Sequence, residues 1–109
     1  MTNYEFGEVL LFNAFPFSDA SGRKKRPTLV LADPGDQDVL VARITSSLSR
    51  DSYDLPISLW QESGLLLPSV VRLSKIATLN KSLVLKKLGI LGSPERRKVR
   101  SVLKKLFGF

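Results

Sequence analysis

The sequence predicts a small, mainly β protein, a barrel or sandwich of short strands covered by one C-terminal helix. Its 109 residues suffice for one domain with one hydrophobic core, so we expect a single domain over residues 1–109. Short apolar runs separated by turn residues predict the strands. A late stretch with apolar residues at helical spacing predicts the helix. That helix is expected to cover an open part of the strand layer.

Three strands are expected in the first half of the chain. Residues 6–12 (FGEVLLF) form a short β-rich run, and residues 27–32 (PTLVLA) have the pattern of a buried strand. Pro27 begins this second run, where a missing N–H does little harm. The order of proline and glycine within residues 33–36 (DPGD) predicts a turn, after which residues 39–45 (VLVARIT) form the third strand.

The second half is expected to add three more strands. Residues 55–60 form a short one, and Pro56 within it predicts an edge position, because proline cannot donate to the sheet's hydrogen bonds. After a turn at residues 63–64 (SG), residues 70–79 (VVRLSKIATL) form a longer strand with partial alternation. The run 83–91 fits either a strand or a helix, and its glycine punctuation favours a strand.

A helix is expected from about Ser93. Ser93 is the expected N-cap, Pro94 suits the first helical position, and Glu95 complements the positive end of the helix. The residues that then fall on one apolar face are Val99, Val102, Leu103, Leu106 and Phe107. The opposite face carries Arg97, Lys98, Lys104 and Lys105, with Arg100 on the flank. We interpret the basic face as solvated, with an RNA or membrane surface as the alternatives.

The composition limits the chemistry available to the chain. It has no cysteine and no histidine, which excludes disulfides, thiolate metal sites and the commonest general base. The net charge of +7 suggests a polyanionic partner, and the surplus lies late in the chain. No run approaches the roughly 18 apolar residues of a membrane helix, and residues 1–8 lack a basic signal-peptide region. We therefore expect a cytoplasmic protein.

Three positions at or within expected strands are candidates for a site. Arg26 precedes the second strand, Thr45 ends the third, and Arg72 interrupts the apolar run VVRL. Each has an ordinary structural explanation, because a single strand arginine usually faces solvent and a strand-end threonine usually packs. Their functional interpretation depends on the segments around them.

Those segments together resemble the MazF/PemK family of toxins. The family pattern of G-[DE]-[IV], R-P-x-L-V-[IL], T-[ST] and V-V-x-x-x-x-I-x-T-[IL]-[DN] appears here as residues 7–9, 26–31, 45–46 and 70–80. No single motif is specific, but the order and spacing hold over nearly the whole chain. The resemblance implies an SH3-like barrel with a C-terminal α-helix that works as a homodimer. It also implies a cognate antitoxin and sequence-specific cleavage of single-stranded RNA, often mRNA, with no metal and no other cofactor.

The resemblance also assigns residues. Arg26 and Thr45 map to active-site positions of the family, and Arg72 to an arginine that some members use. Such chemistry is feasible without histidine or metal. The RNA 2′-OH can attack its own phosphate while a guanidinium holds the developing charge, and the Thr45 and Ser46 hydroxyls orient that phosphate. Some members have an acid where this chain has Ser74, so the general base is not identified, and Asp19 of the first loop is the alternative candidate.

Several features remain open at this level. The basic cluster Arg23, Lys24 and Lys25 either tracks the RNA backbone or is a solvated loop. The loop aromatic residues that could stack on unpaired bases are Phe15, Phe17 and Tyr53. Three consecutive leucines at 65–67 would favour dimerisation if they were exposed. The main alternative function is a non-catalytic SH3-like nucleic-acid-binding or regulatory module, and a membrane-binding basic helix is a third possibility.

Overall fold

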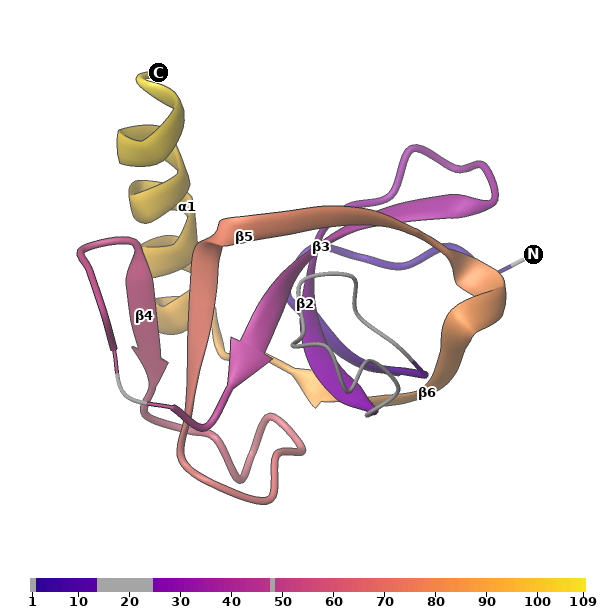
Figure 1. The fold of residues 1–109 in the computed structure, drawn as a ribbon, viewed down its shortest axis with the longest axis horizontal. Coiled ribbons are helices and arrows are strands. Elements are labelled where there is room, and N and C mark those ends of the chain that lie inside the picture. Colours follow the sequence, from indigo (N-terminus) through magenta and orange to yellow (C-terminus); the bar gives the residue numbers. More distant parts are fainter. Residues whose placement is uncertain (1, 14–24, 48) are drawn as a thin grey trace.

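The computed structural model describes residues 2–13, 25–47 and 49–109, and within them one antiparallel sheet is followed by a helix. The elements are β1 (Glu8–Phe12), β2 (Arg26–Ala32), β3 (Asp38–Thr45), β4 (Asp54–Ile57), β5 (Ser69–Asn80), the 3-10 turn η1 (Lys81–Leu83), β6 (Val84–Ile90) and α1 (Ser93–Phe107). The strand order is β4-β5-β3-β2-β1-β6 (Figure 1). The mainly β prediction is confirmed, and so are the strand interpretation of residues 83–91 and the edge position of Pro56.

The sheet is strongly curled and barrel-like, although β4 and β6 do not pair and the ring is not closed by hydrogen bonds. The turn after β4 approaches the backbone of β6 instead. A Cβ added to Gly64, whose φ is +87°, would lie 2.0 Å from the Leu88 carbonyl oxygen. A Cβ on Gly89 would lie 2.5 Å from the Ser63 carbonyl oxygen. Both positions therefore need glycine for the turn to cover this edge of the barrel.

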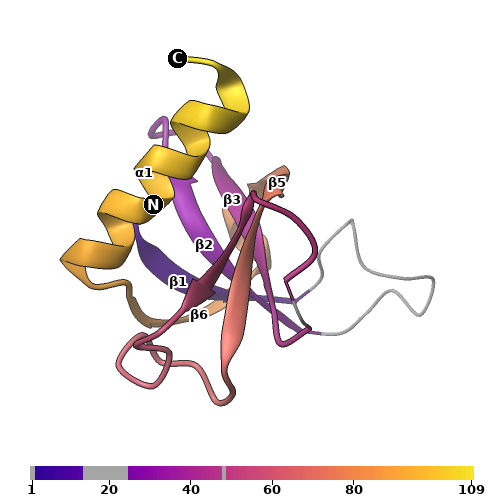
Figure 2. The same cartoon turned by 90° about the vertical axis from the view of Figure 1, so that its left-hand side faces the viewer.

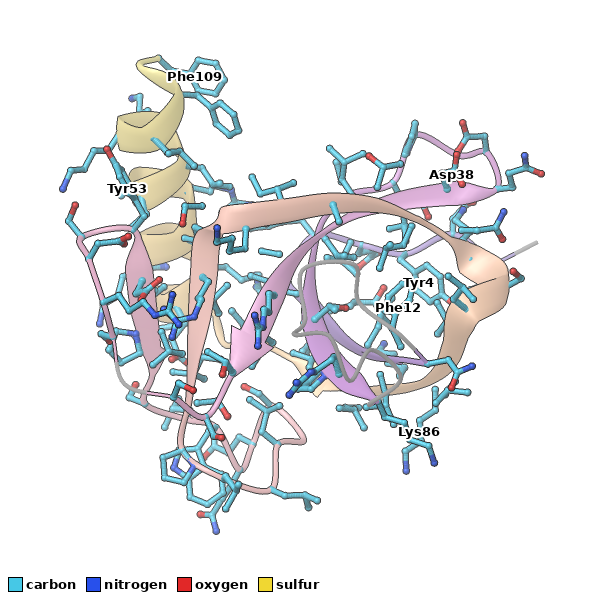
Figure 3. The ribbon with its side chains drawn as sticks, viewed as in Figure 1. Tyr4, Phe12, Asp38, Tyr53, Lys86 and Phe109 are labelled. Atoms are coloured by element: carbon cyan, nitrogen blue, oxygen red, sulfur yellow. The ribbon has the colours of Figure 1, made fainter. Side chains whose placement is uncertain are left out.

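Two apolar clusters lie on the two faces of the curled sheet. The first, between the sheet and α1, includes Leu29, Ile44, Val71 and Val99, and the second, inside the curl, includes Leu10, Phe12, Val30 and Val41. On β3, Val39 and Val41 belong to the second cluster and Ala42 and Ile44 to the first, so the two sets lie on opposite faces, as strand geometry requires. Tyr4 packs against the second cluster, and Figure 3 shows its ring beside Phe12 within the curl.

Strand β5 is longer than expected and has an irregularity at its centre. Ala42 of β3 pairs with Ile76, whereas the next residue, Arg43, pairs with Arg72. Three residues of β5 are therefore left over between the two pairs, and they are Leu73, Ser74 and Lys75. Such an insertion bends a strand and strengthens its local twist. The irregularity explains why apolar and polar residues alternate only partly in this segment of the sequence.

The helix begins where it was expected, but its cap differs. Gly92 is the N-cap and provides no side-chain hydrogen bond, so the N-cap prediction for Ser93 is wrong and Ser93 is already helical. Glu95 is buried and accepts a hydrogen bond of 2.8 Å from the Ser58 backbone N–H. It thus ties α1 to the turn after β4, beyond its expected electrostatic role.

The apolar face of α1 packs on the sheet over its first turns only. Val99 is buried and Val102 and Leu103 pack against the first cluster, which confirms that part of the expected face. Phe107 is 56% exposed, so its assignment to the covered face is wrong. The C-terminal turn projects beyond the strands (Figure 2). Within the described ranges, no helix is long and apolar enough to span a bilayer.

Candidate functional site

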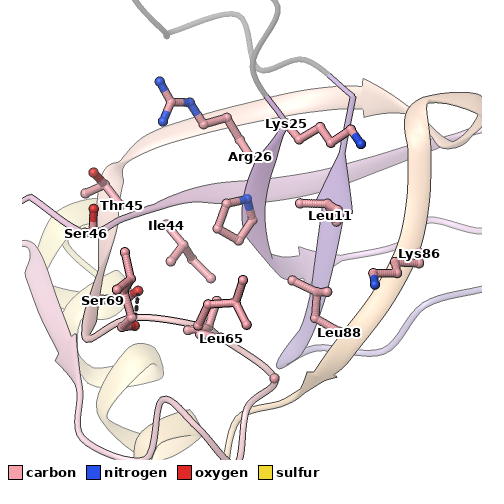
Figure 4. Close-up of a pocket in the computed structure, with 14 residues that line it drawn as sticks. Leu11, Lys25, Arg26, Ile44, Thr45, Ser46, Leu65, Ser69, Lys86 and Leu88 are labelled. Atoms are coloured by element: carbon pink, nitrogen blue, oxygen red, sulfur yellow. Dashed lines mark hydrogen bonds between the residues drawn. The ribbon is translucent and has the colours of Figure 1, made fainter.

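A pocket of about 410 Å³ opens at the end of the sheet where β2 starts and β3 finishes (Figure 4). This volume is in the range of small-ligand sites. Apolar side chains form its walls: Leu11, Pro27, Ile44, Leu65, Leu66, Leu67 and Leu88. Polar and charged groups complete the lining: Lys25, Arg26, Thr45, Ser46, Ser69 and Lys86. An apolar cavity with a few polar groups is the usual composition of a binding site.

The sheet register explains why Arg26 and Thr45 meet. Thr28 pairs with Arg43 in the antiparallel β2–β3 ladder. Continued by two residues on each strand, the same register sets Arg26 opposite Thr45. Directly opposed residues share a face of the sheet, and their Cβ atoms lie about 4.5–5.5 Å apart. Both side chains line the pocket, so the structure brings these two predicted residues together (Figure 4).

Thr45 presents a hydroxyl whose proton remains available. Its Oγ1 accepts a hydrogen bond of 3.2 Å from the Ser47 backbone N–H, which orders the turn after β3. A hydroxyl that accepts one bond can still donate another. The side chain is 7% exposed and therefore held in place, whereas Ser46 beside it is exposed. Thr45 is thus a fixed donor on the pocket lining.

Arg26 is half-buried, and among the described residues it makes no ion pair. Its Nε is buried and has no hydrogen-bond partner. An unsatisfied charged donor in a cleft is costly and indicates a place for an external acceptor. Two further cations, Lys25 and Lys86, line the pocket, and both are exposed. The cationic lining therefore favours an anionic ligand.

The neighbouring Lys87 differs from Lys86, because it pairs with the buried carboxylate of Glu8. This hydrogen bond raises the pKa of Lys87 above its ordinary value. Glu8 also accepts from the Glu5 backbone N–H at 2.6 Å. Lys87 thus balances a structural carboxylate, while Lys86 faces the pocket.

Arg72 is not brought to this pocket. Its guanidinium is buried and donates from Nη1 to Asp54 Oδ2 at 2.5 Å. The same carboxylate oxygen accepts from the Arg50 backbone N–H at 2.7 Å. Ser74 is exposed on the irregular part of β5 and is not among the lining residues. Both residues were expected to contact RNA, and the structure places both outside the pocket.

Other candidates lie elsewhere. Tyr53 is half-buried, and the ammonium of Lys105 lies 5.5 Å from its ring centroid, so a contact with the helix already uses this aromatic face. Five candidates from the first loop fall outside the described residues: Phe15, Phe17, Asp19, Arg23 and Lys24. Among the described residues, no cluster of acidic, histidine or cysteine side chains has the arrangement of a metal site.

The sequence analysis did not predict two of the polar residues that line the pocket, Lys86 and Ser69. Lys86 and Ser69 reach the pocket from strands that are remote in sequence, and neither has a local pattern to mark it.

The curled sheet and this pocket define a small barrel-like protein whose cationic site combines a guanidinium with an ordered hydroxyl. Residues 5–107 match the family described as the PemK-like, MazF-like toxin of type II toxin-antitoxin systems, and the chain belongs to this family. No curated protein matches the sequence.

Solved structures share the fold at low sequence identity. MazF from Deinococcus radiodurans is 18% identical with a TM-score of 0.77, and the match covers 100% of both chains. The Mycobacterium tuberculosis toxin MazF-mt6 is 23% identical with a TM-score of 0.73, covering 92% of this chain and 97% of that one. A mycobacterial endoribonuclease in complex with its cognate antitoxin is 17% identical with a TM-score of 0.77, covering 97% and 96%.

Proposed function

We propose that the protein is a metal-independent, sequence-specific endoribonuclease that cleaves single-stranded RNA, and that it acts as the toxin of a toxin–antitoxin pair. The observation that carries the proposal is the meeting of Arg26 and Thr45 on the lining of a cationic pocket. Family membership supports the same assignment. If the substrate is messenger RNA, we expect the protein to act in the cytoplasm, because that is where messenger RNA is translated.

The proposed reaction is an attack of the RNA 2′-OH on its neighbouring phosphorus. The P–O5′ bond breaks, the 2′-OH gives up its proton to water, and the leaving 5′-oxygen takes a proton from water, so the products carry a 2′,3′-cyclic phosphate and a 5′-hydroxyl. Negative charge grows on the non-bridging phosphate oxygens in the transition state. The guanidinium of Arg26 stabilises that charge, and the hydroxyl of Thr45 donates to one of the same oxygens. Because both groups are positioned before the substrate binds, little reorganisation accompanies the reaction.

Binding of the strand uses the remainder of the pocket. An unpaired base next to the scissile phosphate enters the apolar cavity between Pro27, Leu65 and Leu88. Bases in single strands are recognised by insertion and stacking of this kind. Lys25, Lys86 and Ser46 contact the adjacent backbone, where phosphate contacts supply position and affinity. Sequence specificity then comes from the shape and polar groups of the cavity.

The metal-free character of the proposed reaction gives a direct test. Purified protein is incubated with a long single-stranded viral RNA in buffer that contains a chelator, and the new ends are mapped by primer extension. We expect cleavage at a few recurring sequences, with no loss of rate at increasing chelator concentration. A DNA strand of the same sequence should stay intact, because it has no 2′-OH. Absence of cleavage under all conditions would favour the alternative, a non-catalytic nucleic-acid-binding module.

Two protein partners are part of the proposal. The antitoxin is expected to cover the pocket with an acidic segment, since Lys25, Arg26 and Lys86 are gathered there. The second partner is another copy of the chain. Leu66 is 92% exposed and Leu67 58% exposed, whereas Leu65 is buried. Exposed apolar side chains beside a pocket are typical of an interface.

We therefore expect a homodimer at micromolar concentration. Light scattering coupled to size exclusion should give twice the chain mass of 12.1 kDa. Leu66→Lys should shift the mass toward the monomer, because a lysine at this exposed position is readily solvated in the free chain but costly within an apolar interface. A monomeric mass for the unmodified protein would contradict the dimer.

A further inference from the structure

Ser69 is a buried polar side chain on the apolar side of the pocket. It begins β5 and is 9% exposed. It pairs with Ile57 of β4 and lies two residues before Val71, and both of these residues belong to the first apolar cluster. Opposed residues and alternate residues of a strand share a face, so Ser69 lies on the face of that cluster. Ile44 and Leu65 of the same cluster also line the pocket, so the Ser69 hydroxyl lies among its apolar walls.

The hydroxyl of Ser69 can offer a ligand a lone pair but no proton. Its Oγ donates a hydrogen bond of 2.8 Å to the Leu67 carbonyl oxygen (Figure 4). A serine hydroxyl has one proton and two lone pairs. Because a carbonyl oxygen cannot donate, the one proton of Ser69 is committed to Leu67. Toward the pocket, Ser69 is therefore an acceptor.

The phosphate-binding side of the pocket has the opposite chemistry. Thr45 follows Ile44 directly, so it lies on the other face of β3, and Arg26 shares that face with it. Thr45 Oγ1 accepts from the Ser47 backbone N–H and keeps its proton for donation, and a guanidinium can only donate. The pocket thus has donors at one side and an acceptor at the other. A nucleotide whose phosphate accepts and whose base donates matches this arrangement.

The bases differ in what they can donate to Ser69. Adenine, cytosine and guanine each carry an exocyclic amino group. Uracil has a carbonyl oxygen where cytosine has its amino group, and its one ring N–H lies between two carbonyl oxygens. A uracil carbonyl facing Ser69 Oγ sets two acceptors against each other among apolar side chains, where neither finds a donor. The acceptor therefore favours an amino-bearing base over uracil.

We propose that Ser69 is a specificity-determining residue, which accepts a hydrogen bond from the exocyclic amino group of the base that enters the pocket and thereby disfavours uracil there. The inference rests on the proposed RNA cleavage and deepens it. The scissile phosphate lies at Arg26 and Thr45, and the neighbouring base reaches Ser69 through the apolar cavity. The apolar walls hold any base by contact, and the Ser69 lone pair distinguishes between bases.

The test compares Ser69→Ala and Ser69→Thr with the unmodified protein. Affinity for a 2′-O-methylated single strand, prepared with adenosine, cytidine or uridine throughout and measured over a range of salt concentrations, reports binding without turnover. Mapping the cuts in a long single-stranded viral RNA reports the bases beside the scissile bond. Ser63→Ala is the matched control. Ser63 is 1% exposed and its Oγ donates to the Leu59 carbonyl oxygen at 3.0 Å, but it is not among the residues that line the pocket.

We expect Ser69→Ala to lose the discrimination between bases. The affinity of the better amino-bearing strand relative to the uridine strand should fall about tenfold, a usual loss for one buried hydrogen bond. The slope of log affinity against log salt should stay the same, because a base contact neutralises no phosphate. Ser69→Thr keeps a hydroxyl and should keep the discrimination, as should Ser63→Ala. In the RNA map, Ser69→Ala should add cuts beside uridine that the unmodified protein does not make.

The two assays separate this inference from the function on which it rests. A Ser69→Ala protein with unchanged discrimination overturns the base contact while RNA cleavage stands. A reduced salt slope assigns Ser69 to a phosphate and overturns the base contact too. If the unmodified protein does not cut RNA, the proposed function fails, and the ratio of affinities still decides the role of Ser69.

A change in the RNA keeps the inference testable if Ser69→Ala does not fold, which circular dichroism checks. The preferred strand is prepared again with hydrogen in place of the amino group of each base and is given to the unmodified protein. We expect this strand to bind about tenfold more weakly than its amino-bearing counterpart. Equal affinity for the two strands would overturn the hydrogen bond to Ser69.

Discussion

Replacing Arg26 with alanine is expected to lower the rate of RNA cleavage by about 10²–10³ or more, the usual loss when one charge-stabilising donor is removed. The physical reason is the position of the guanidinium. It lines the pocket beside Thr45, and its buried Nε has no partner within the protein. The loss should appear mainly in kcat, because the developing charge is greatest in the transition state. Single-turnover cleavage of a mapped RNA site measures it.

Two comparisons make this result specific. Arg26 begins β2 and is half-buried, so Arg26→Ala should unfold within a few degrees of the unmodified protein. Thr45→Ala should also slow cleavage, but less, because it removes a neutral donor instead of a charged one. An Arg26→Ala protein that cuts at the unmodified rate would exclude the clamp. A protein that loses activity only through unfolding would reveal itself by its thermal transition.

The strand pattern could be predicted because each element carries a local signal. Two mainly apolar runs became β2 and β3 within one residue of the expected bounds at each end. The first turns of α1 followed from the apolar spacing together with Pro94 and Glu95 at the start of the helix. The prediction failed for Ser93 and Phe107, where local preference competes with tertiary context. Gly92 has an extended backbone and occupies the N-cap position in place of Ser93. The helix extends beyond the sheet, so no strand covers Phe107.

The candidate site could be predicted only in part, because its parts come from different strands. The family motifs predict Arg26 and Thr45 as active-site residues, and the β2–β3 register explains why the two meet. The apolar wall could not be anticipated. Leu65 and Leu88 are distant in sequence, and they reach the pocket because Gly64 and Gly89 allow their backbones to approach.

The expected effect of Asp54→Ala is on stability. Asp54 and Arg72 form an ion pair whose side chains are 1% and 5% exposed. Breaking such a buried pair from one side typically costs about 3–5 kcal/mol, because the remaining charge stays in a poorly solvated place. That is a large part of the roughly 5–15 kcal/mol that holds a domain folded. The urea concentration at the midpoint of unfolding, measured at neutral pH, should fall in proportion to this loss of free energy.

A double variant separates the cost of burying an uncompensated charge from the value of the pair itself. Replacing both partners, as in Asp54→Ala with Arg72→Met, removes the charge along with its counterion, so most of the lost stability should return. A single Asp54→Ala protein within about 1 kcal/mol of the original would show that the pair contributes little.

The double variant also decides the role of Arg72 in RNA binding. A folded double variant that binds the 2′-O-methylated strand with the unmodified salt slope assigns Arg72 to the fold alone. A reduced slope would return Arg72 to the RNA surface that the family resemblance implies. The buried position of its guanidinium, turned toward β4, leads us to expect the unmodified slope.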